Sequence, residues 1–497
     1  MNSKYEELSR ILERAMAIHT GLVLLEWDNE TLAPAEAGDD TGKVQGILSA
    51  EYQQLITGQK TRELIAACQN DHSLNEVQTA IVREAAEEAE RLGCIPPAEY
   101  RAYTELTSKS ARIWAKARSE RDFSKFAPVL EEVISYQKKF ASYRAKEGQK
   151  LYNIMLDSYE KEFDIKHLDL FFDHLKAALV PLLKQVSNAR KQIDNSFLSG
   201  DYAEEKQQEA AHFLAEYVGF DFNRGVLAVS AHPFTTNLHN HDVRITTHYN
   251  DRVDSSIFSV IHEAGHGIYE LGIADELTLT LIGQGASMGM HESQSRFFEN
   301  MIGRHPAFWE PLYGQMQEWF PEQLDHISLQ VFTEGINKVT AGLIRTEADE
   351  LTYSLHVLIR YELEKALIED NLNVLELPKL WADKYEEYLG VRPEHDGVGV
   401  LQDIHWSQGS FGYFPSYALG SAFAAQIHAW MEGRIDFAGH LREGRLKEIR
   451  ECLREHIHQY GKLRPSRELL KSMTGEDFNP DYYVKYLQQK YKKLYEL

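Results

Sequence analysis

Amphipathic helical patterns run through most of this chain and constrain its fold more than any other feature. Between Tyr5 and Arg190, apolar residues recur every three or four positions, and only short breaks separate one pattern from the next. We expect helices at Asn75–Arg91, Pro97–Arg118, Lys166–Arg190, Ala203–Val218, Pro306–Trp319, Ser328–Ile368, Leu375–Leu389, Ser416–Met431, Arg442–Gln459 and Tyr482–Tyr495. The sequence therefore predicts an all-α, predominantly helical fold.

One segment departs from the helical pattern and predicts a small β-sheet. In Asp242–His248, Val243 and Ile245 alternate with polar residues, as in a strand with one buried face. A short sheet whose edge strand lies beside a binding site could bind an extended peptide through main-chain hydrogen bonds. An ordinary half-buried strand fits the same pattern equally well.

Length and composition favour a single domain. No Pro/Gly/Ser-rich linker or shift in composition divides the 497 residues. We predict one domain over residues 1–497, with a helical N-terminal half of about residues 1–225 and a C-terminal half of about residues 226–497.

The charge balance disfavours two classes of partner. The chain has 53 Lys and Arg against 76 Asp and Glu, a net charge of −23, with no basic cluster to offset it. Nucleic acid and anionic membranes are therefore poor partners. The first twenty residues are charged where a secretion signal needs an apolar core, and no apolar run approaches the roughly 20 residues of a membrane span. We expect a cytoplasmic protein without a membrane partner.

A His-Glu-x-x-His run lies in a stretch that reads as helix. His262 and His266 are four residues apart, so a helix places both imidazoles on one face, and Glu292 follows twenty-six residues after His266. Two imidazoles and a carboxylate can hold zinc and leave one coordination position open for water, while Glu263 stands beside the ion as a base. The alternative is a chance match in a chain with 21 histidines.

The context of this run supports a buried helix. Asp254 or Ser255 can cap it at its start. Gly265 and Gly267 are poor helix formers, so we expect another element or a substrate to pack closely against that turn.

Two further segments carry groups suited to binding a peptide. Arg345, in an expected long helix, could hold a substrate carboxylate with two hydrogen bonds, although an arginine beside Glu347 and Asp349 is more often part of a structural ion pair. The loop after His405 is rich in glycine and aromatics, and could place His405 and a tyrosine where negative charge develops, or be a packed turn. His232 and the histidines at 239, 241 and 248 lack a helical pair, which favours substrate contact or exposure over a second metal site.

Taken together, these segments match six ordered motifs of the Taq-type metallocarboxypeptidases, and the chain resembles that family. The motifs are His232-Pro233-Phe234; Asp242, Arg244 and Thr246; His262, Glu263 and His266; His291-Glu292-Ser293; Arg345, Ala348 and Asp349; and Gly399, Gln402, Asp403, His405 and Trp406. The resemblance spans residues 232 to about 420. One departure is Glu350, where the family usually has proline.

The resemblance implies a fold and a set of roles. The fold would be zincin-like, similar to angiotensin-converting enzyme, thimet oligopeptidase and neurolysin, with the N-terminal half forming one wall of a deep groove, the C-terminal half carrying the metal site, and two copies forming a homodimer. The implied roles are metal ligands for His262, His266 and Glu292; general base for Glu263; anchor of the substrate carboxylate for Arg345; stabilisation of the intermediate for His405 with Tyr417 or Tyr413; and substrate contacts for His232, Asp242 and Arg244.

We therefore expect a carboxypeptidase of broad preference that acts on peptides with a free C-terminus and binds one Zn²⁺ per chain, for which Co²⁺ or Mn²⁺ can substitute. One alternative is a zinc oligopeptidase that cuts internal bonds, which differs only in whether Arg345 anchors a free carboxylate. The other is a non-catalytic zinc-binding scaffold, which would be expected to have lost Glu263 or a ligand.

Overall fold

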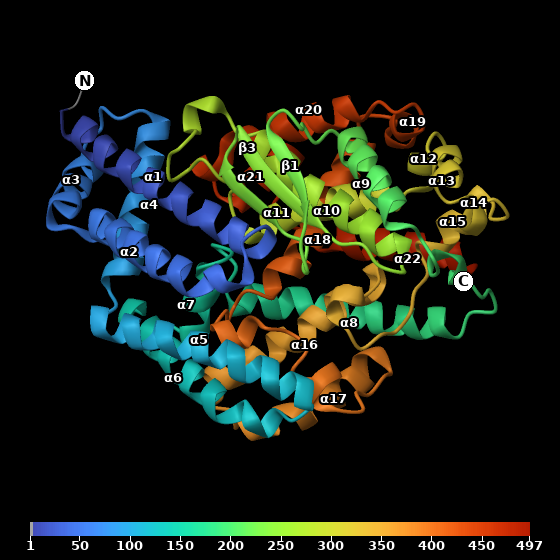
Figure 1. Ribbon diagram of the computed structural model, residues 1–497, viewed down its shortest axis with the longest axis horizontal. Coiled ribbons are helices and arrows are strands. Elements are labelled where there is room, and N and C mark those ends of the chain that lie inside the picture. The colour runs from blue at the N-terminus through green and yellow to red at the C-terminus, as the bar shows by residue number, and fades with distance from the viewer. Residues whose placement is uncertain (1–2) are drawn as a thin grey trace. The chain divides into compact units, whose positions relative to one another are not determined.

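Helices make up most of the computed structural model, which describes residues 3–497 (Figure 1). The chain forms two compact units. Unit 1 comprises the chain up to Gly93, Asp194–Ile336 and Ile427–Phe478, and unit 2 comprises Cys94–Ile193, Asn337–Gln426 and Asn479–Leu497. The predicted helical fold with a small sheet is confirmed, whereas the single catalytic domain with halves meeting near residue 225 stays a prediction.

Unit 1 contains the sheet and most of the helices. Its elements are α1 (Ser3–Thr31), α2 (Gly38–Thr57), α3 (Gln59–Gln69), α4 (Glu76–Gly93), α9 (Glu204–Val218), β1 (Gly225–Val229), β2 (Thr235–His239), β3 (Asp242–Thr247), α10 (Val253–Leu271), α11 (Met288–Arg296), α12 (Pro306–Trp309), α13 (Tyr313–Trp319), α14 (Pro321–Leu324), α15 (Leu329–Gly335), α19 (Phe437–Arg442), α20 (Leu446–His456) and α21 (Ser466–Thr474).

Unit 2 is helical over its described residues. Its elements are α5 (Pro97–Glu120), α6 (Ala127–Arg144), α7 (Leu151–Asp157), α8 (Ile165–Ser187), α16 (Glu350–Glu369), α17 (Leu377–Leu389) and α22 (Asp481–Tyr495). Helix α18 (Pro415–Glu432) begins in unit 2 and ends in unit 1. No helix among the described residues is both long and apolar enough to cross a membrane.

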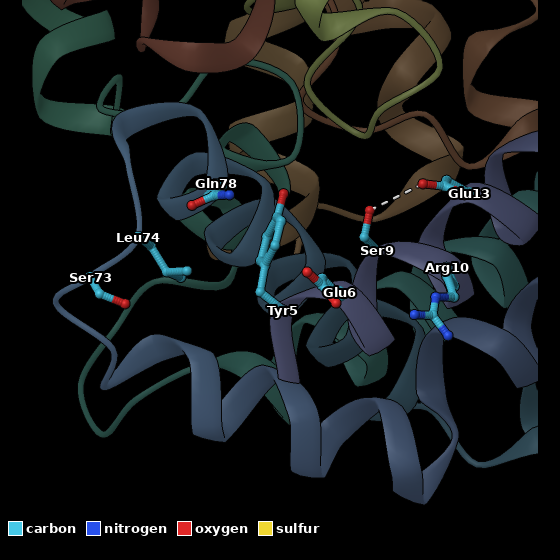
Figure 2. Close-up of a pocket in the computed structure, with 8 residues that line it drawn as sticks. All are labelled: Tyr5, Glu6, Ser9, Arg10, Glu13, Ser73, Leu74 and Gln78. Carbon is cyan, nitrogen blue, oxygen red and sulfur yellow. Dashed lines mark hydrogen bonds between the residues drawn. The ribbon is translucent and has the colours of Figure 1, made fainter. Parts of the chain in front are cut away.

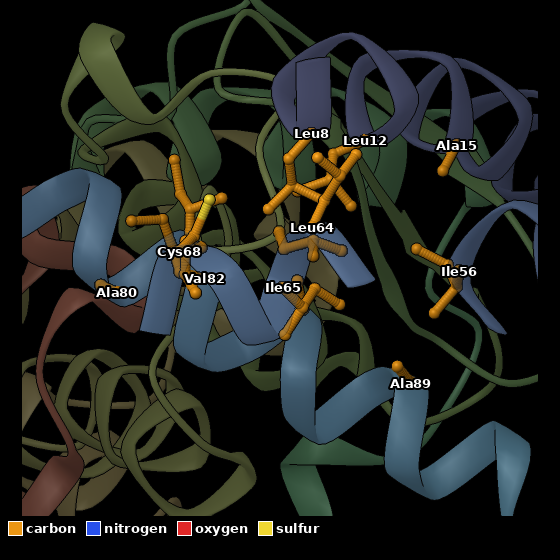
Figure 3. Close-up of a cluster of buried hydrophobic side chains, with 14 of the residues drawn as sticks. Leu8, Leu12, Ala15, Ile56, Leu64, Ile65, Cys68, Ala80, Val82 and Ala89 are labelled. Carbon is orange, nitrogen blue, oxygen red and sulfur yellow. The ribbon is translucent and has the colours of Figure 1, made fainter. Parts of the chain in front are cut away.

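The first four helices share a hydrophobic core in unit 1. Figure 3 shows side chains from α1 to α4 that point toward one another, among them Leu8, Leu12, Leu64 and Cys68. Each of these four is at most 4% exposed. The apolar stripe of each helix is therefore buried against its neighbours, as its periodicity predicts.

The sheet has the strand order β1-β3-β2, with β3 parallel to β1 and antiparallel to β2. The expected strand at Asp242–His248 is confirmed as β3, and Val243 and Ile245 are fully buried. Strand β3 lies in the centre of the sheet. The strand at the edge that contacts the histidine helix α10 is β2.

Helix α10 carries the His-Glu-x-x-His run and packs against β2, β3, α9 and α11. The predicted close packing at its glycines is confirmed. A Cβ on Gly265 would lie 2.8 Å from the Cα of Ser295 in α11, and one on Gly267 would lie 2.6 Å from the ring of Phe220. Glycine at position 265 thus allows α11, with Glu292, to approach the two histidines.

The predicted side-chain cap of α10 is wrong. The N-cap residue is Arg252, which makes no capping hydrogen bond. The carboxylate of Asp254 binds Arg252 at 2.6 Å, and the hydroxyl of Ser255 lies 2.8 Å from Nε2 of His248. Both side chains are therefore engaged elsewhere.

The long helix expected at Ser328–Ile368 is also wrong, because α15 ends at Gly335 and α16 begins at Glu350. Asp349 caps α16 by accepting hydrogen bonds from the main-chain N–H groups of Leu351 and Thr352. Arg345 lies between the helices, in the short 3₁₀ turn Arg345–Glu347. The helices expected at Pro306–Trp319 and Arg442–Gln459 are likewise interrupted or shorter.

Candidate metal centre

Three side chains of unit 1 converge as the sequence predicts. Glu292 Oε2 lies 3.8 Å from Nε2 of His262 and 3.7 Å from Nε2 of His266. All three residues offer a ligand atom within 4.8 Å of the others. A tetrahedral site with bonds of about 2.0–2.1 Å needs ligand atoms about 3.4 Å apart, so a small adjustment would place all three on one ion.

The ring nitrogen of His262 that faces away from Glu292 is held by a carboxylate. Its Nδ1 lies 2.9 Å from Oε2 of Glu299, in the π-helical turn Phe297–Gly303 that follows α11. Burial alone would raise the pKa of Glu299, but Arg296 foremost, with His262 and Arg304, holds it well below its usual range. An ionised Glu299 keeps the proton on Nδ1 and leaves Nε2 to bind a metal.

His266 is held through a second histidine. Its Nδ1 lies 2.6 Å from Nδ1 of His291, and Nε2 of His291 lies 2.6 Å from Oε1 of Glu270. When Nε2 of His266 binds a metal, its Nδ1 must donate, so Nδ1 of His291 accepts and Nε2 of His291 donates to Glu270. The chain of hydrogen bonds thus assigns one proton position to each ring.

Burial and neighbouring charges shift the pKa values of His266 and His262. Burial lowers the pKa of His266 well below its usual value, with His291 and His262 acting in the same direction, so its imidazole is neutral, the form that binds metals. Burial also favours a lower pKa for His262, but Glu292 and Glu299 outweigh it and raise that pKa.

Glu263 lies on α10 next to the ligands but outside the group that could hold an ion. The hydroxyl of Thr235 donates a hydrogen bond of 2.6 Å to its Oε2. Burial raises the pKa of Glu263, opposed by His262 and by the hydrogen bond from Thr235. A carboxylate with a raised pKa is suited to accept and return a proton.

Three other predicted residues of unit 1 lie at the sheet. Asp242 and Arg244 of β3 bind each other through two hydrogen bonds of 2.9 and 2.8 Å, and the guanidinium of Arg244 stacks 4.8 Å from the ring centre of Trp27. His232 is exposed in the segment before β2.

Arg345 lies in unit 2, where it is 6% exposed. Its Nε and Nη2 donate to Oδ1 of Asp403 at 3.0 and 2.9 Å, and its Nη1 donates to the hydroxyl of Tyr353 at 3.1 Å. The other oxygen of Asp403 accepts from Arg360 at 2.8 Å. Arg345 therefore forms an ion pair, but with Asp403 rather than with the neighbouring Glu347 or Asp349. Each of its terminal nitrogens keeps one N–H without a partner among the described residues.

His405 of unit 2 stands among aromatic rings. Its Nε2 lies 3.2 Å from the hydroxyl of Tyr417, and its ring centre lies 4.4 Å from that of Phe414 and 5.4 Å from that of Tyr413. Burial lowers the pKa of His405 to about 4, only partly offset by Asp403. His405 is therefore neutral near pH 7 and can donate one hydrogen bond.

A surface cavity of about 860 Å³ elsewhere in unit 1 contains none of these residues. Figure 2 shows its lining, where Ser9 donates a hydrogen bond of 3.2 Å to Glu13. The lining residues are Tyr5, Glu6, Ser9, Arg10, Glu13, Ser73, Leu74 and Gln78. It lacks histidine and is not the metal centre.

Sequence analysis missed several residues that hold the predicted ones. Glu270 follows His266 by four positions and Glu299 follows Glu292 by seven, so helical periodicity could have placed each on the same helix face as a predicted ligand. His291 adjoins Glu292, and its place in a motif indicated no role of its own. Thr235 gave no signal, because the strand that carries it was not predicted.

Known proteins resemble this chain over nearly its whole length. The model of the carboxypeptidase Taq (M32) metallopeptidase family matches residues 7–491. Carboxypeptidase 1 of Bacillus subtilis is 41% identical over 495 residues, and thermostable carboxypeptidase 1 of Pyrococcus furiosus is 35% identical over 494, each match covering 99% of both chains. The M32 carboxypeptidase structure from Deinococcus radiodurans R1 is 32% identical, with a TM-score of 0.97 over 100% of both chains. This chain belongs to the carboxypeptidase Taq (M32) family of metallopeptidases.

Proposed function

We propose that this metallocarboxypeptidase uses zinc to release amino acids one at a time from the free C-termini of peptides, with broad preference. The convergence of Nε2 of His262, Nε2 of His266 and Oε2 of Glu292 carries the proposal. Two imidazoles and one carboxylate are a donor set that suits zinc and leaves a position open for water. Co²⁺ or Mn²⁺ could take the same ligands.

The residues of unit 1 supply the proton transfers. A zinc ion held by His262, His266 and Glu292 would supply Lewis acidity toward the scissile carbonyl and would lower the pKa of a bound water to about 7. Glu263 accepts a proton from the attacking water and returns it to the departing amino group. The hydroxyl of Thr235 donates a hydrogen bond to Oε2 of Glu263, and Oε1 of Glu263 has no partner among the described residues.

The residues of unit 2 are assigned to charge stabilisation and anchoring. Neutral His405, with Tyr417 or Tyr413, donates hydrogen bonds to the negative charge of the tetrahedral intermediate. Arg345 anchors the substrate carboxylate with the two N–H groups that do not bind Asp403 or Tyr353. The competing role for Arg345 is a purely structural ion pair.

In unit 1, His232, Asp242 and Arg244 are proposed substrate contacts. Support comes from their place in the family motifs and from the contact of β2, which follows His232, with α10. A homodimer rests on the family resemblance alone, and analytical ultracentrifugation tests it. A cytoplasmic location rests on the composition and on three cysteines that form no disulfide.

Mass spectrometry of a peptide ladder tests the proposed reaction. The zinc-loaded protein should shorten free-acid peptides by single C-terminal residues and leave C-terminally amidated peptides intact. Arg345→Lys should raise KM for free acids, because lysine cannot make paired hydrogen bonds to a carboxylate. Internal fragments, or equal cleavage of amides and free acids, would support the oligopeptidase reading instead.

The role of Glu263 has its own test. Glu263→Gln should retain bound zinc and lose nearly all turnover. A variant that keeps more than about a tenth of the wild-type kcat, a loss of only about 1.4 kcal/mol in transition-state stabilisation, would contradict the role of general base.

A further inference from the structure

A buried carboxylate of unit 2 binds both ends of the segment that runs from His405 to Tyr413. Glu364 of α16 accepts a hydrogen bond of 2.8 Å from Nε1 of Trp406 on one oxygen. Its other oxygen accepts 2.8 Å from the main-chain N–H of Gly412. Trp406 directly follows His405, and Gly412 directly precedes Tyr413.

Glu364 is fully buried, and its third hydrogen bond comes from another helix. The hydroxyl of Tyr152 in α7 donates to the oxygen that Gly412 also uses, at 2.7 Å. Burial raises the pKa of Glu364 to about 7, although the three donors and the nearby Arg360 each lower it. Burying a carboxylate costs free energy, and here every hydrogen bond that offsets this cost reaches the segment or its neighbour α7.

The segment itself has little regular structure to hold it. After the 3₁₀ turn His405–Gln408, Gly409 and Gly412 adopt left-handed conformations with φ of +77° and +87°. A Cβ on Gly412 would lie 2.8 Å from the main chain of Met155, so the backbone there presses against α7. The position of His405 therefore depends on contacts made by the segment with the rest of unit 2.

We infer that Glu364 is a positioning residue for peptide hydrolysis, which fixes His405 and Tyr413 by holding Trp406 and Gly412. The inference rests on the proposed roles of His405 and the tyrosines. Glu364 does not touch the substrate. It sets the direction in which the imidazole and the phenol present their hydrogen-bond donors, and a small misplacement of such donors reduces turnover far more than it reduces binding.

Glutamine at position 364 gives a sharp test because it has the shape of glutamate but brings N–H donors. With its NH₂ toward Trp406, two N–H groups face each other. With its NH₂ toward Gly412, the NH₂ faces the main-chain N–H of Gly412, and two donors again oppose each other. Tyr152 can rotate its hydroxyl to accept from the NH₂, but the N–H of Gly412 cannot adjust. Either orientation releases one end of the segment.

We expect Glu364→Gln to lower kcat on the order of tenfold with KM changed less than about twofold and with zinc content unchanged. Trp406→Phe removes one donor, so in the double variant the amide can turn its NH₂ toward Phe and its oxygen toward Gly412. The kcat of the double variant should therefore equal that of Trp406→Phe alone and exceed that of Glu364→Gln. The matched control is Glu362→Gln, which changes a partly exposed carboxylate on the same helix as Glu364. Glu362 binds Lys384 of α17, and its change should leave kcat unchanged.

Three results decide the inference. A folded Glu364→Gln that keeps more than half of the wild-type kcat, or a double variant slower than Glu364→Gln, overturns it. If Glu364→Gln does not fold, two other variants test the inference. Trp406→Phe should lower kcat, whereas Tyr152→Phe, which leaves both ends of the segment bound to Glu364, should not. Equal changes of kcat in these two variants overturn the inference. If His405→Gln keeps full turnover, the proposed function of His405 fails instead.

Discussion

The hydroxyl of Thr235 on β2 donates a hydrogen bond of 2.6 Å to Oε2 of Glu263 on α10. The sheet thereby fixes the direction of the proposed general base. Thr235→Val keeps the shape of the side chain and removes the donor, so Glu263 should lose its orientation. We expect kcat to fall on the order of tenfold, about 1.4 kcal/mol, with zinc content unchanged.

Thr235→Ser is the matched control, because serine keeps the hydroxyl, and it should retain most of the wild-type kcat. Equal losses in the serine and valine variants would show that packing of the threonine methyl group, rather than its hydrogen bond, supports Glu263.

The chain of hydrogen bonds from His266 through His291 to Glu270, here called the relay, predicts an effect on metal affinity. Glu270 accepts hydrogen bonds from His291 and Asn237, and the Asn237 carbonyl oxygen is buried without a partner among the described residues. Glu270→Gln should therefore fit, since Asn237 can turn its amide to accept from the new NH₂. The change removes the negative charge and gives up only a long hydrogen bond of 3.4 Å from Asn237 to the carbonyl oxygen of Gly283. We expect zinc affinity to fall about 10-fold or more. Competition with a chromophoric chelator measures it, and an unchanged Kd would remove Glu270 from the relay.

Glu350, the one departure from the family motif, predicts an effect on stability. Its side chain is 1% exposed and lies 2.5 Å from Nζ of Lys490 in α22. Lys490→Met should reduce the free energy of unfolding by about 3 kcal/mol, because it leaves a buried carboxylate without its ion pair. Adding Glu350→Pro should restore most of the loss, since proline is tolerated in the first turn of a helix. Urea titrations of both variants test this, and no difference between them would contradict it.

His405 predicts a dependence of stability on pH. Its pKa is lowered from 6.5 to about 4 in the folded protein. Between pH 6.5 and pH 4, His405 is protonated in the unfolded chain but neutral in the folded protein. The unfolded chain therefore binds more protons, and the free energy of unfolding decreases as the pH falls from 6.5 toward 4. Wild type should lose up to about 2 kcal/mol relative to His405→Gln between pH 7 and pH 5. If the difference between their unfolding free energies is the same at both pH values, His405 is not buried in neutral form.

Helical periodicity was sufficient to predict the elements that pack by their own apolar faces. It located α8 and α10, and the two glycines of α10 correctly signalled a close neighbour, because only a backbone without Cβ permits the approach of α11. The shared direction of His262 and His266 was predictable for the same reason, since residues four apart on a helix share a face.

The features that failed depend on contacts distant in sequence. Strand β2 is extended because it pairs with β3 and lies against α10, and its own residues Thr235–His239 show no clear alternation. Arg345 reads as helical, but the cap at Asp349 and the ion pair with Asp403, fifty-eight residues away, hold it in a turn. Likewise Glu364 stands in an ordinary helical pattern, and only the fold brings Trp406 and Gly412 to it.

The most direct test of this account is anomalous diffraction at the zinc edge from crystals of the zinc-loaded protein. The account predicts one peak per chain, about 2.0–2.1 Å from Nε2 of His262, Nε2 of His266 and Oε2 of Glu292, with Glu263 outside the coordination sphere. A peak that Glu292 does not coordinate, or a peak bound by Glu263, would contradict it.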